Sequence, residues 1–285
     1  MRRYVCKSCI WTMLLAGGMQ VQPTMLSAQN PALDIPNVTL ELPEYVSTLL
    51  SDDDRELFTR LLNINVEAAW GFLRNEGHTM NFISDIRPVH PDMRFVGRAR
   101  TGRYLPNRPD MRDQYKGPQL NAQTAVDTKP GDVLVFDMGG HLESSPSGDV
   151  SCLAAMVNGC AGVVVEGVMR DVPAFINMGL PLFTRDGRGH TAAGSSEVMS
   201  WDYQIPVRVG DVTVAPGDYL VGVAHGVLVI PPSMVEKTLE FAEKKSVQEF
   251  FQRKLLMEGE SVIGVYPPSK ETLKRLEEWK KSQPH

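Results

Sequence analysis

The sequence is poor in cysteine, and folding cannot rest on a disulfide framework. Four cysteines occur in 285 residues. Cys152 and Cys160 lie along or just past one expected helix, where a rise of ~1.5 Å per residue separates them by about 12 Å. A disulfide does not span that distance. We therefore expect both thiols to be buried as small apolar groups.

The sequence also lacks a basic tract. It has 29 lysines and arginines against 34 acidic residues, a formal net charge of -5. Without a basic cluster or an RNA-binding signature, nucleic acid is excluded as a direct partner. Hydrophobic residues make up 42% of the chain and charged residues 22%. That balance is ordinary for a globular protein with a true core.

Several catalytic signatures are missing. The chain has no Gly-x-Ser-x-Gly motif, no phosphate loop and no dinucleotide fingerprint. Its six histidines include no pair at a metal-binding spacing. These absences argue against a serine hydrolase, a nucleotide-dependent enzyme and a methyltransferase. We interpret His141, which lies near Asp137, as a polar loop residue.

The first 28 residues have the order of a secretory signal peptide. A positive start, which contains Arg2, Arg3 and Lys7, precedes a modest apolar stretch over residues 10–21. Small residues then offer a cleavage site before Gln29. Glycines break the apolar stretch well short of the ~20 residues that a membrane helix needs. We expect export, to the periplasm, and no stable membrane anchor.

The rest of the chain alternates helical and strand patterns. We expect a leader over residues 29–46, a mixed domain over 47–260 and a C-terminal helical tail over 261–285. Apolar spacing predicts helices over 47–75, 150–157, 233–258 and 270–281. Strands are predicted over 94–104, 133–136, 163–165 and 181–183, with short strands over 206–231. Loops are predicted over 105–120, 139–148 and 184–199.

Two helix starts carry capping signals. Ser51 precedes three aspartates and is typical of an N-cap. Ser233, with Glu236 three residues later, has the pattern of a capping box. The order of elements predicts an α/β core with a β-rich second half and flanking N- and C-terminal helices. It lacks the regular alternation of a barrel enzyme.

The most informative stretch begins at Gly148 and Asp149. It follows a Gly/Ser loop and opens a helix, where the first backbone N–H groups have no internal partner and lie at the positive end of the helix dipole. Gly148 has no side chain to block an approaching ligand. A carboxylate can bind at such a place. Alternatively, Ser147 and Asp149 simply cap the helix.

A charged pair, Arg170 and Asp171, follows the buried strand at 163–165. Arginine binds carboxylates through two parallel hydrogen bonds. Aspartate is a hard oxygen ligand for Mg²⁺ or Mn²⁺, and magnesium often needs only one or two protein carboxylates. A surface ion pair is the simpler interpretation of the same two residues.

The spacing Asp149-x20-Arg170-Asp171, with Gly148 before it, resembles the signature of the RraA-like family. This family includes 4-hydroxy-4-methyl-2-oxoglutarate aldolases, regulators of ribonuclease E activity and proteins mislabelled as demethylmenaquinone methyltransferases. The similarity covers about residues 55–260. Further matching segments are FVGRART at 95–101, GDVLVFD at 131–137, GCAGVVVEG at 159–167 and VAPGDYLVGVAHGVLVIPP at 214–232.

The resemblance implies a swivelling β/β/α-type core and a metal-dependent pyruvate aldolase with oxaloacetate decarboxylase side activity. Asp171 would be the ligand of Mg²⁺ or Mn²⁺, and Arg170 would bind a small 2-oxo acid. Asp149 would position a catalytic water. The substrate cradle would consist of Gly148, Asp149, Val150 and Ser151. The resemblance also implies a homotrimer or a hexamer.

Two other functions stay open. One is a non-enzymatic binding or regulatory protein on the same fold, and the other is a lyase or isomerase that acts on an oxidised sugar. The chain has Ser151 where the family often has leucine. It has Val223 and His225 where family members often carry acids. These departures leave the substrate unspecified.

Overall fold

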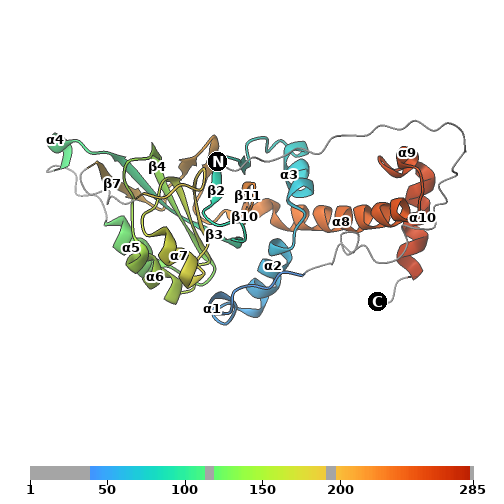
Figure 1. Cartoon of the computed structure of the whole chain (residues 1–285), viewed down its shortest axis with the longest axis horizontal. Coiled ribbons are helices and arrows are strands. Elements are labelled where there is room, and N and C mark those ends of the chain that lie inside the picture. The colour runs from blue at the N-terminus through green and yellow to red at the C-terminus, as the bar shows by residue number, and fades with distance from the viewer. Residues whose placement is uncertain (1–38, 113–118, 191–196, 283–285) are drawn as a thin grey trace, which may run out of the picture. The chain divides into compact units, whose positions relative to one another are not determined.

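The computed structural model describes residues 39–112, 119–190 and 197–282 (Figure 1). The described residues from Leu40 onward form one compact unit. The predicted signal peptide and most of the predicted leader lie outside the described residues, so both stay predictions. Within the described part of the chain, no helix is long and apolar enough to cross a membrane.

One large mixed sheet forms the centre of this unit. Its strands run in the order β1-β11-β10-β3-β4-β5-β6-β2, and β7 pairs with β3. A separate hairpin joins β8 and β9. The strands are β1 (Phe82–Ile83), β2 (Ile86–Pro88), β3 (Phe95–Pro106), β4 (Asp132–His141), β5 (Gly162–Gly167), β6 (Leu182–Arg185), β7 (Val198–Tyr203), β8 (Val207–Val209), β9 (Val212–Val214), β10 (Tyr219–Val223) and β11 (Gly226–Ile230).

The four central strands, β3 to β6, are parallel. Parallel neighbours need a crossover connection, and helices supply it. They are α5 (Leu120–Asp127), α6 (Asp149–Val157) and α7 (Val172–Met178). These helices lie together on one face of the sheet (Figure 1). Their apolar residues pack on Leu134, Phe136 and Val163 in one buried cluster.

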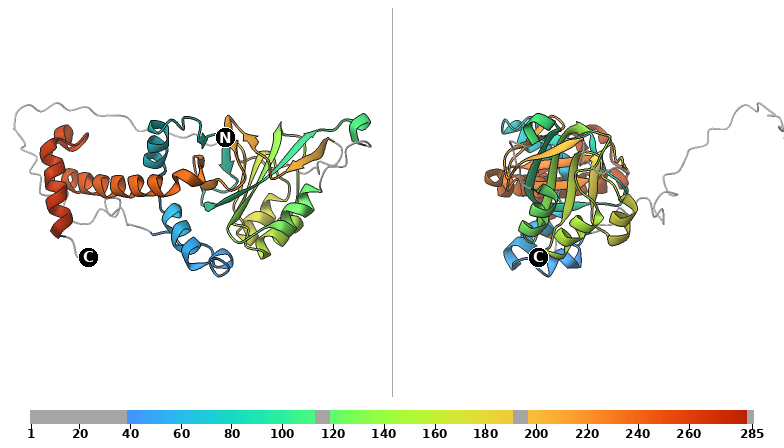
Figure 2. Two further views of the ribbon diagram at one scale, coloured as in Figure 1. Left: turned by 180° about the vertical axis from the view of Figure 1, so that it is seen from behind. Right: turned by 90° about the vertical axis from the view of Figure 1, so that its left-hand side faces the viewer.

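The opposite face of the sheet carries a second, larger core. Val133, Val135 and Val164 point into it, as strand alternation requires. It is covered by the β8–β9 hairpin, by the first part of α8 (Val235–Met257), and by α2 (Asp52–Leu62) and α3 (Val66–Asn75). Figure 2 shows this arrangement from behind and from one side. Because both faces are covered, the central strands read as continuous apolar runs.

The prediction of one continuous helix over residues 47–75 is wrong. The structure has α1 (Glu44–Ser47), α2 and α3 there. The Asn65 side chain accepts a hydrogen bond from the Ala68 N–H and so starts a new helix, because asparagine is a strong N-cap. The predicted cap at Ser51 is confirmed: its hydroxyl accepts from the Asp54 N–H.

The predicted capping box at Ser233 is also wrong. Ser233 lies inside a short 3-10 turn, η2 (Pro232–Met234), and α8 begins after it without a side-chain cap. A residue inside the preceding turn lacks the extended backbone of an N-cap. The chain ends in α9 (Val262–Val265) and α10 (Lys270–Ser282), close to the predicted final helix.

Other loop predictions need smaller corrections. A short helix, α4 (Pro109–Arg112), lies within the predicted loop 105–120, and β4 continues to His141. The two cysteines are free and buried, as predicted. The mixed α/β architecture with flanking helices is confirmed. The finer swivelling β/β/α assignment stays a prediction.

Candidate functional site

The candidate site lies beyond the carboxyl ends of β4 and β5. Because these strands are parallel and adjacent, the segments that follow them emerge at the same edge of the sheet. The segment after β4 leads to Gly148 and α6. The segment after β5 leads to Arg170 and Asp171. The topology thus brings the start of α6 close to Arg170 and Asp171, although twenty residues separate Asp149 from Arg170 in the sequence.

Arg170 lies directly against Gly148. A Cβ atom built on Gly148 would stand 2.5 Å from Nη2 of Arg170 and 2.8 Å from its Nε. The Arg170 Nε donates to the Ser147 carbonyl oxygen at 3.3 Å. Only glycine leaves room for the guanidinium in this position. The close approach of Arg170 therefore explains why residue 148 is glycine, since its extended backbone does not require one.

The two terminal nitrogens of Arg170 have no acceptor among the described residues. The Arg170 side chain is 40% exposed, and it forms part of a pocket wall. A guanidinium presents donors in a planar fork that matches a carboxylate. Arg170 is therefore held at its Nε and open at its terminal nitrogens, which is suitable for an anionic ligand.

The start of α6 offers further donors. Gly148 is the N-cap and supplies no side-chain hydrogen bond to the helix. The first backbone bond of the helix runs from the Cys152 N–H to the Gly148 carbonyl oxygen. The N–H groups of Val150 and Ser151 therefore have no acceptor within the described residues. Neither Ser147 nor Asp149 caps α6 through its side chain.

Asp171 lies at the N-cap of α7 in the left-handed region, with φ 61° and ψ 28°. Its carboxylate accepts weakly from the Asp149 N–H at 3.4 Å and lies 3.4 Å from Nε of Arg170. Its side chain is 36% exposed and makes no capping bond. The carboxylate thus keeps lone pairs free beside Arg170 and the start of α6.

A pocket of about 250 Å³ adjoins this group. Of the predicted site residues, Gly148, Ser151 and Arg170 line it. Asp149 is half-buried, and the Val150 side chain is 76% exposed. Val150 would therefore contribute to the cradle only through its backbone. The pocket lining is Tyr104, Asn121, Ser145, Pro146, Ser147, Gly148, Ser151, Arg170, Val198 and Ser200.

Sequence patterns missed most of this wall. Tyr104 on β3, Asn121 on α5 and Ser200 on β7 enter the pocket from distant parts of the chain. Tyr104 is buried and donates to the Pro146 carbonyl oxygen at 3.1 Å. Burial raises the pKa of the Tyr104 phenol well above its ordinary value. The pairing of β7 with β3 brings Ser200 opposite Tyr104, and no local motif reports that pairing.

The donor set fits a divalent metal held mainly by water and ligand. Within residues 39–112, 119–190 and 197–282, no three His, Cys, Asp or Glu side chains gather into a metal cluster. Mg²⁺ needs only one or two carboxylates when substrate and water complete its shell. The uncapped Asp171 carboxylate can supply one such oxygen. An all-protein cage for zinc or calcium does not fit these residues.

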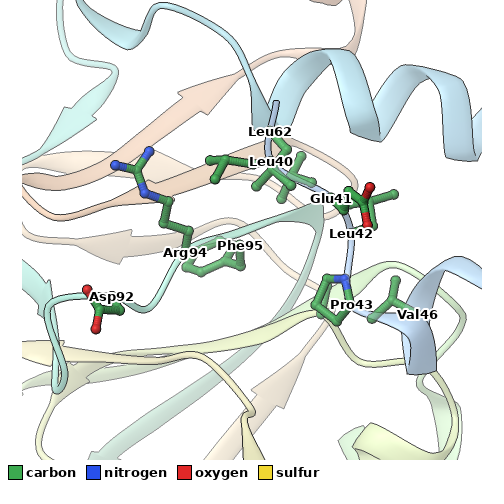
Figure 3. Close-up of a pocket in the computed structure, with 11 residues that line it drawn as sticks. Leu40, Glu41, Leu42, Pro43, Val46, Leu62, Asp92, Arg94 and Phe95 are labelled. Atoms are coloured by element: carbon green, nitrogen blue, oxygen red, sulfur yellow. The ribbon is translucent and has the colours of Figure 1, made fainter. Parts of the chain in front are cut away.

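A second pocket, of about 190 Å³, lies between the start of β3 and the segment before α1. Figure 3 shows its lining, with the aliphatic side chains of Leu40, Leu42 and Val46 on one side. Arg94 and Asp92 lie at its margin. None of the predicted site residues lines this pocket. Its walls are mainly apolar, so it offers no second convergence of catalytic groups.

Comparison with known proteins settles the family. A family model described as RraA-like, Aldolase/RraA, matches residues 48–229. The chain belongs to the RraA-like family. The match begins just before α2 and ends in β11, so it contains all of the sheet except the last residue of β11, and every predicted site residue. The helices α8 to α10 lie beyond it.

The relatives carry the names of both enzymes and regulators. A protein of Halalkalibacterium halodurans with the provisional name 4-hydroxy-4-methyl-2-oxoglutarate aldolase is 32% identical over 187 residues, which cover 65% of this chain and 83% of that protein. The crystal structure of Streptomyces coelicolor RraAS2, described as an unusual member of the RNase ES inhibitor RraA protein family, is 27% identical. It has a TM-score of 0.62 and covers 75% of this chain and 98% of its own.

A third comparison supports the fold alone. An uncharacterised protein from Pseudomonas syringae is 23% identical, with a TM-score of 0.61. The match covers 74% of this chain and 96% of that one. The same fold therefore occurs in a protein of this low identity.

Proposed function

We propose that this RraA-like protein is a divalent-metal-dependent carbon–carbon lyase of the pyruvate-aldolase type. The observation that carries the proposal is that the unbonded terminal nitrogens of Arg170 lie beside the first N–H groups of α6 and the partly exposed carboxylate of Asp171. At the margin of one pocket, the guanidinium and the backbone N–H groups offer hydrogen-bond donors for an anion, and the carboxylate would offer a ligand for a metal. The name of the Halalkalibacterium halodurans relative supports the same class.

Asp171 would hold Mg²⁺ or Mn²⁺, which when bound supplies a Lewis acid for the 2-oxo acid. Arg170 would bind the substrate carboxylate through its terminal nitrogens. The N–H groups of Val150 and Ser151 would stabilise negative charge as it develops on substrate oxygen, since preorganised donors act most strongly on such charge. Water is partly excluded by the walls of the pocket.

The reaction needs one proton to leave the substrate hydroxyl and one to reach carbon. In an aldol cleavage the hydroxyl loses its proton, the adjacent C–C bond breaks, and its electron pair becomes the enolate of pyruvate. The enolate carbon then takes a proton. Asp149 is half-buried beside Asp171. We propose that its carboxylate holds the water that carries these protons. Decarboxylation of oxaloacetate passes through the same enolate.

We further propose that copies of the chain assemble through α6, as a trimer or a dimer of trimers. Val150, Leu153, Ala154 and Val157 stand one turn apart on one side of this helix, and all four are exposed. Val126 on the neighbouring α5 is 74% exposed. Exposed apolar stripes of this kind mark interaction surfaces. The stripe begins next to Gly148, so assembly would place a second copy beside the site.

The location of the protein is also a proposal. The signal-like composition of residues 1–28 supports export to the periplasm. It disfavours a partnership with a cytoplasmic ribonuclease, although the likeness to RraAS2 makes regulation the second candidate function. A regulator has no need of a carboxylate placed beside an arginine with open terminal nitrogens, so the arrangement of Asp171 and Arg170 supports the enzyme.

The deciding experiment is oxaloacetate decarboxylation by the full chain with Mg²⁺, with Mn²⁺ and after exhaustive chelation. We expect activity that requires the metal and returns when it is restored. Activity that survives chelation would refute a metal-dependent lyase. Absence of activity on oxaloacetate and on pyruvate aldol adducts would leave the regulatory candidate.

A further inference from the structure

The wall of the pocket beside Arg170 is rich in hydroxyl groups. Five of its ten residues carry one, and Asn121 adds an amide. Only Pro146 and Val198 offer a purely apolar side chain. A ligand chain of methyl and methylene groups would cover these polar atoms without bonding them, and each polar group left without a partner weakens binding. A chain that itself carries hydroxyls would satisfy them.

Several of these groups have hydrogen-bonding capacity to spare. The Ser151 hydroxyl and the Asn121 side-chain N–H₂ group have no partner among the described residues. Ser147 is 7% exposed, and its hydroxyl receives only a long contact from the Cys152 thiol at 3.8 Å. The Ser200 hydroxyl is bonded to the Tyr104 phenol, yet one hydroxyl can donate once and accept twice.

Three of these groups line the same pocket as Arg170. Ser151 comes from α6, Ser200 from β7 and Asn121 from α5. A carboxylate on Arg170 would therefore direct the rest of a bound acid along these polar side chains. The volume of about 250 Å³ is below the ~300–1,000 Å³ of pockets for drug-sized ligands, which limits the ligand to a small acid.

We propose that the substrates are polyhydroxylated 2-oxo acids, the acids of oxidised sugars, and that Ser151, Ser200 and Asn121 select them. This inference rests on the proposed lyase function. For a 3-deoxy-2-oxo sugar acid the C4 hydroxyl loses its proton and C4 becomes an aldehyde as the C3–C4 bond breaks. C3 keeps the electron pair as enolate and takes a proton. The products are pyruvate and a hydroxylated aldehyde, and no oxidant or reductant is needed.

Binding tests the selection without turnover. The probes are D-gluconate and hexanoate, two six-carbon monocarboxylates that differ in their hydroxyls, measured by calorimetry on the full chain without metal. We expect gluconate to bind about tenfold more tightly or better, because a site built for hydroxyls rejects an analogue that lacks them. Equal binding, tighter binding of hexanoate or no binding of either would overturn the inference.

Variants assign the selection to named residues. The double change Ser151→Ala with Ser200→Ala should reduce the preference for gluconate to about threefold or less. Ser151→Thr, which keeps the hydroxyl, should retain most of it. Ser233→Ala is the matched control, since Ser233 is exposed and outside the pocket. A preference unchanged in the double variant would show that these serines do not select the ligand.

Turnover separates this inference from the proposed function. The paired substrates are 2-oxo-3-deoxygluconate and 4-hydroxy-4-methyl-2-oxoglutarate, with oxaloacetate as the general enolate probe. We expect kcat/KM to favour the hydroxylated substrate by about tenfold or more. Metal-dependent decarboxylation of oxaloacetate with preference for the methylated acid would overturn only the inference. Absence of all three activities would refute the lyase function. The comparison of gluconate with hexanoate would then still test the ligand preference of the pocket.

Discussion

The guanidinium of Arg170 occupies the space that a side chain at position 148 would need. A Cβ on Gly148 would lie 2.5 Å from Nη2 of Arg170 and 2.9 Å from its Cζ. The clash falls on the far end of a flexible side chain, so the arginine would move and the backbone would not. Gly148 therefore sets the position of Arg170 without contributing much to folding.

Replacing Gly148 by alanine should separate activity from stability. The backbone at Gly148 is extended, with φ -148°, which alanine adopts without strain. We expect decarboxylation to fall about a hundredfold as Arg170 is displaced by ~1 Å, with little change in melting temperature. Gly71→Ala is the control, because a Cβ there meets nothing within 4 Å and the change should stabilise α3 by ~0.5–1 kcal/mol. Equal activity in both variants would contradict this role.

Asp171→Asn should abolish metal-dependent activity while the fold persists. Asparagine keeps the shape and tolerates the left-handed backbone of this position. We expect Mg²⁺ affinity, measured by calorimetry, and turnover to fall by about two orders of magnitude or more. Asp186→Asn is the matched control, since Asp186 is exposed and also has a positive φ. Unchanged Mg²⁺ binding in Asp171→Asn would exclude Asp171 as the ligand.

Val157→Glu should weaken assembly of the proposed trimer. Val157 is 72% exposed at the end of α6 away from Gly148, so a charge there would disturb an interface before it disturbed the site. We expect sedimentation velocity to show a shift toward monomer at micromolar concentration. Met80→Glu, at a position 57% exposed, should leave the sedimentation coefficient unchanged. A wild-type monomer at the same concentration would refute assembly itself.

The two thiols should make folding sensitive to alkali. Burial raises the pKa of Cys152 and of Cys160 from 9.0 to about 12. The folded state therefore keeps protons that the unfolded chain releases above pH 9. The free energy of unfolding should be unaffected by these groups below pH 9, and should fall as pH rises above 9 toward the pKa of the folded state.

Chemical denaturation at pH 8, 9 and 10 tests the thiol prediction. Cys152→Ala should reduce the alkaline slope while lowering stability at pH 8. Native protein should react with a thiol reagent far more slowly than unfolded protein, since thiolates are the reactive form. Fast labelling of both thiols in the native state would contradict their burial.

The predicted export can be tested by N-terminal sequencing. If residues 1–28 act as a signal, the mature chain should begin near Gln29 in the exported fraction. Recovery of chain with Met1 intact, in the cytosol only, would refute export. The measurement is independent of activity.

Local signals predicted much of the fold. The apolar runs at 133–136 and 163–165 identified β4 and β5, and Ser51 marked the start of α2. The break at Asn65 was missed because apolar spacing continues across it. Pairing of distant segments was equally invisible: no pattern near Ser200 reports that β7 lies against β3 and Tyr104.

The candidate site was predicted to the extent that its residues flank neighbouring strands. The family resemblance grouped Gly148 and Arg170 into one site, and the structure brings them into contact. The hydroxyl-rich wall could not be predicted, since Tyr104, Asn121 and Ser200 converge only through the tertiary fold. The need for glycine at position 148 could not be predicted either, because it arises from contact with the Arg170 side chain, twenty-two positions away in the sequence.

The long helix α8 has two separately anchored ends. Its 23 residues span about 35 Å at ~1.5 Å per residue. The buried residues of its first part, Val235 to Ala242, join the main core, and Phe251 and Leu255 join a small cluster with α9 and α10. Residues 243–250 have no buried side chain. The C-terminal cluster can therefore open as a cooperative unit of its own, and amide hydrogen exchange along α8 should divide into two protection classes.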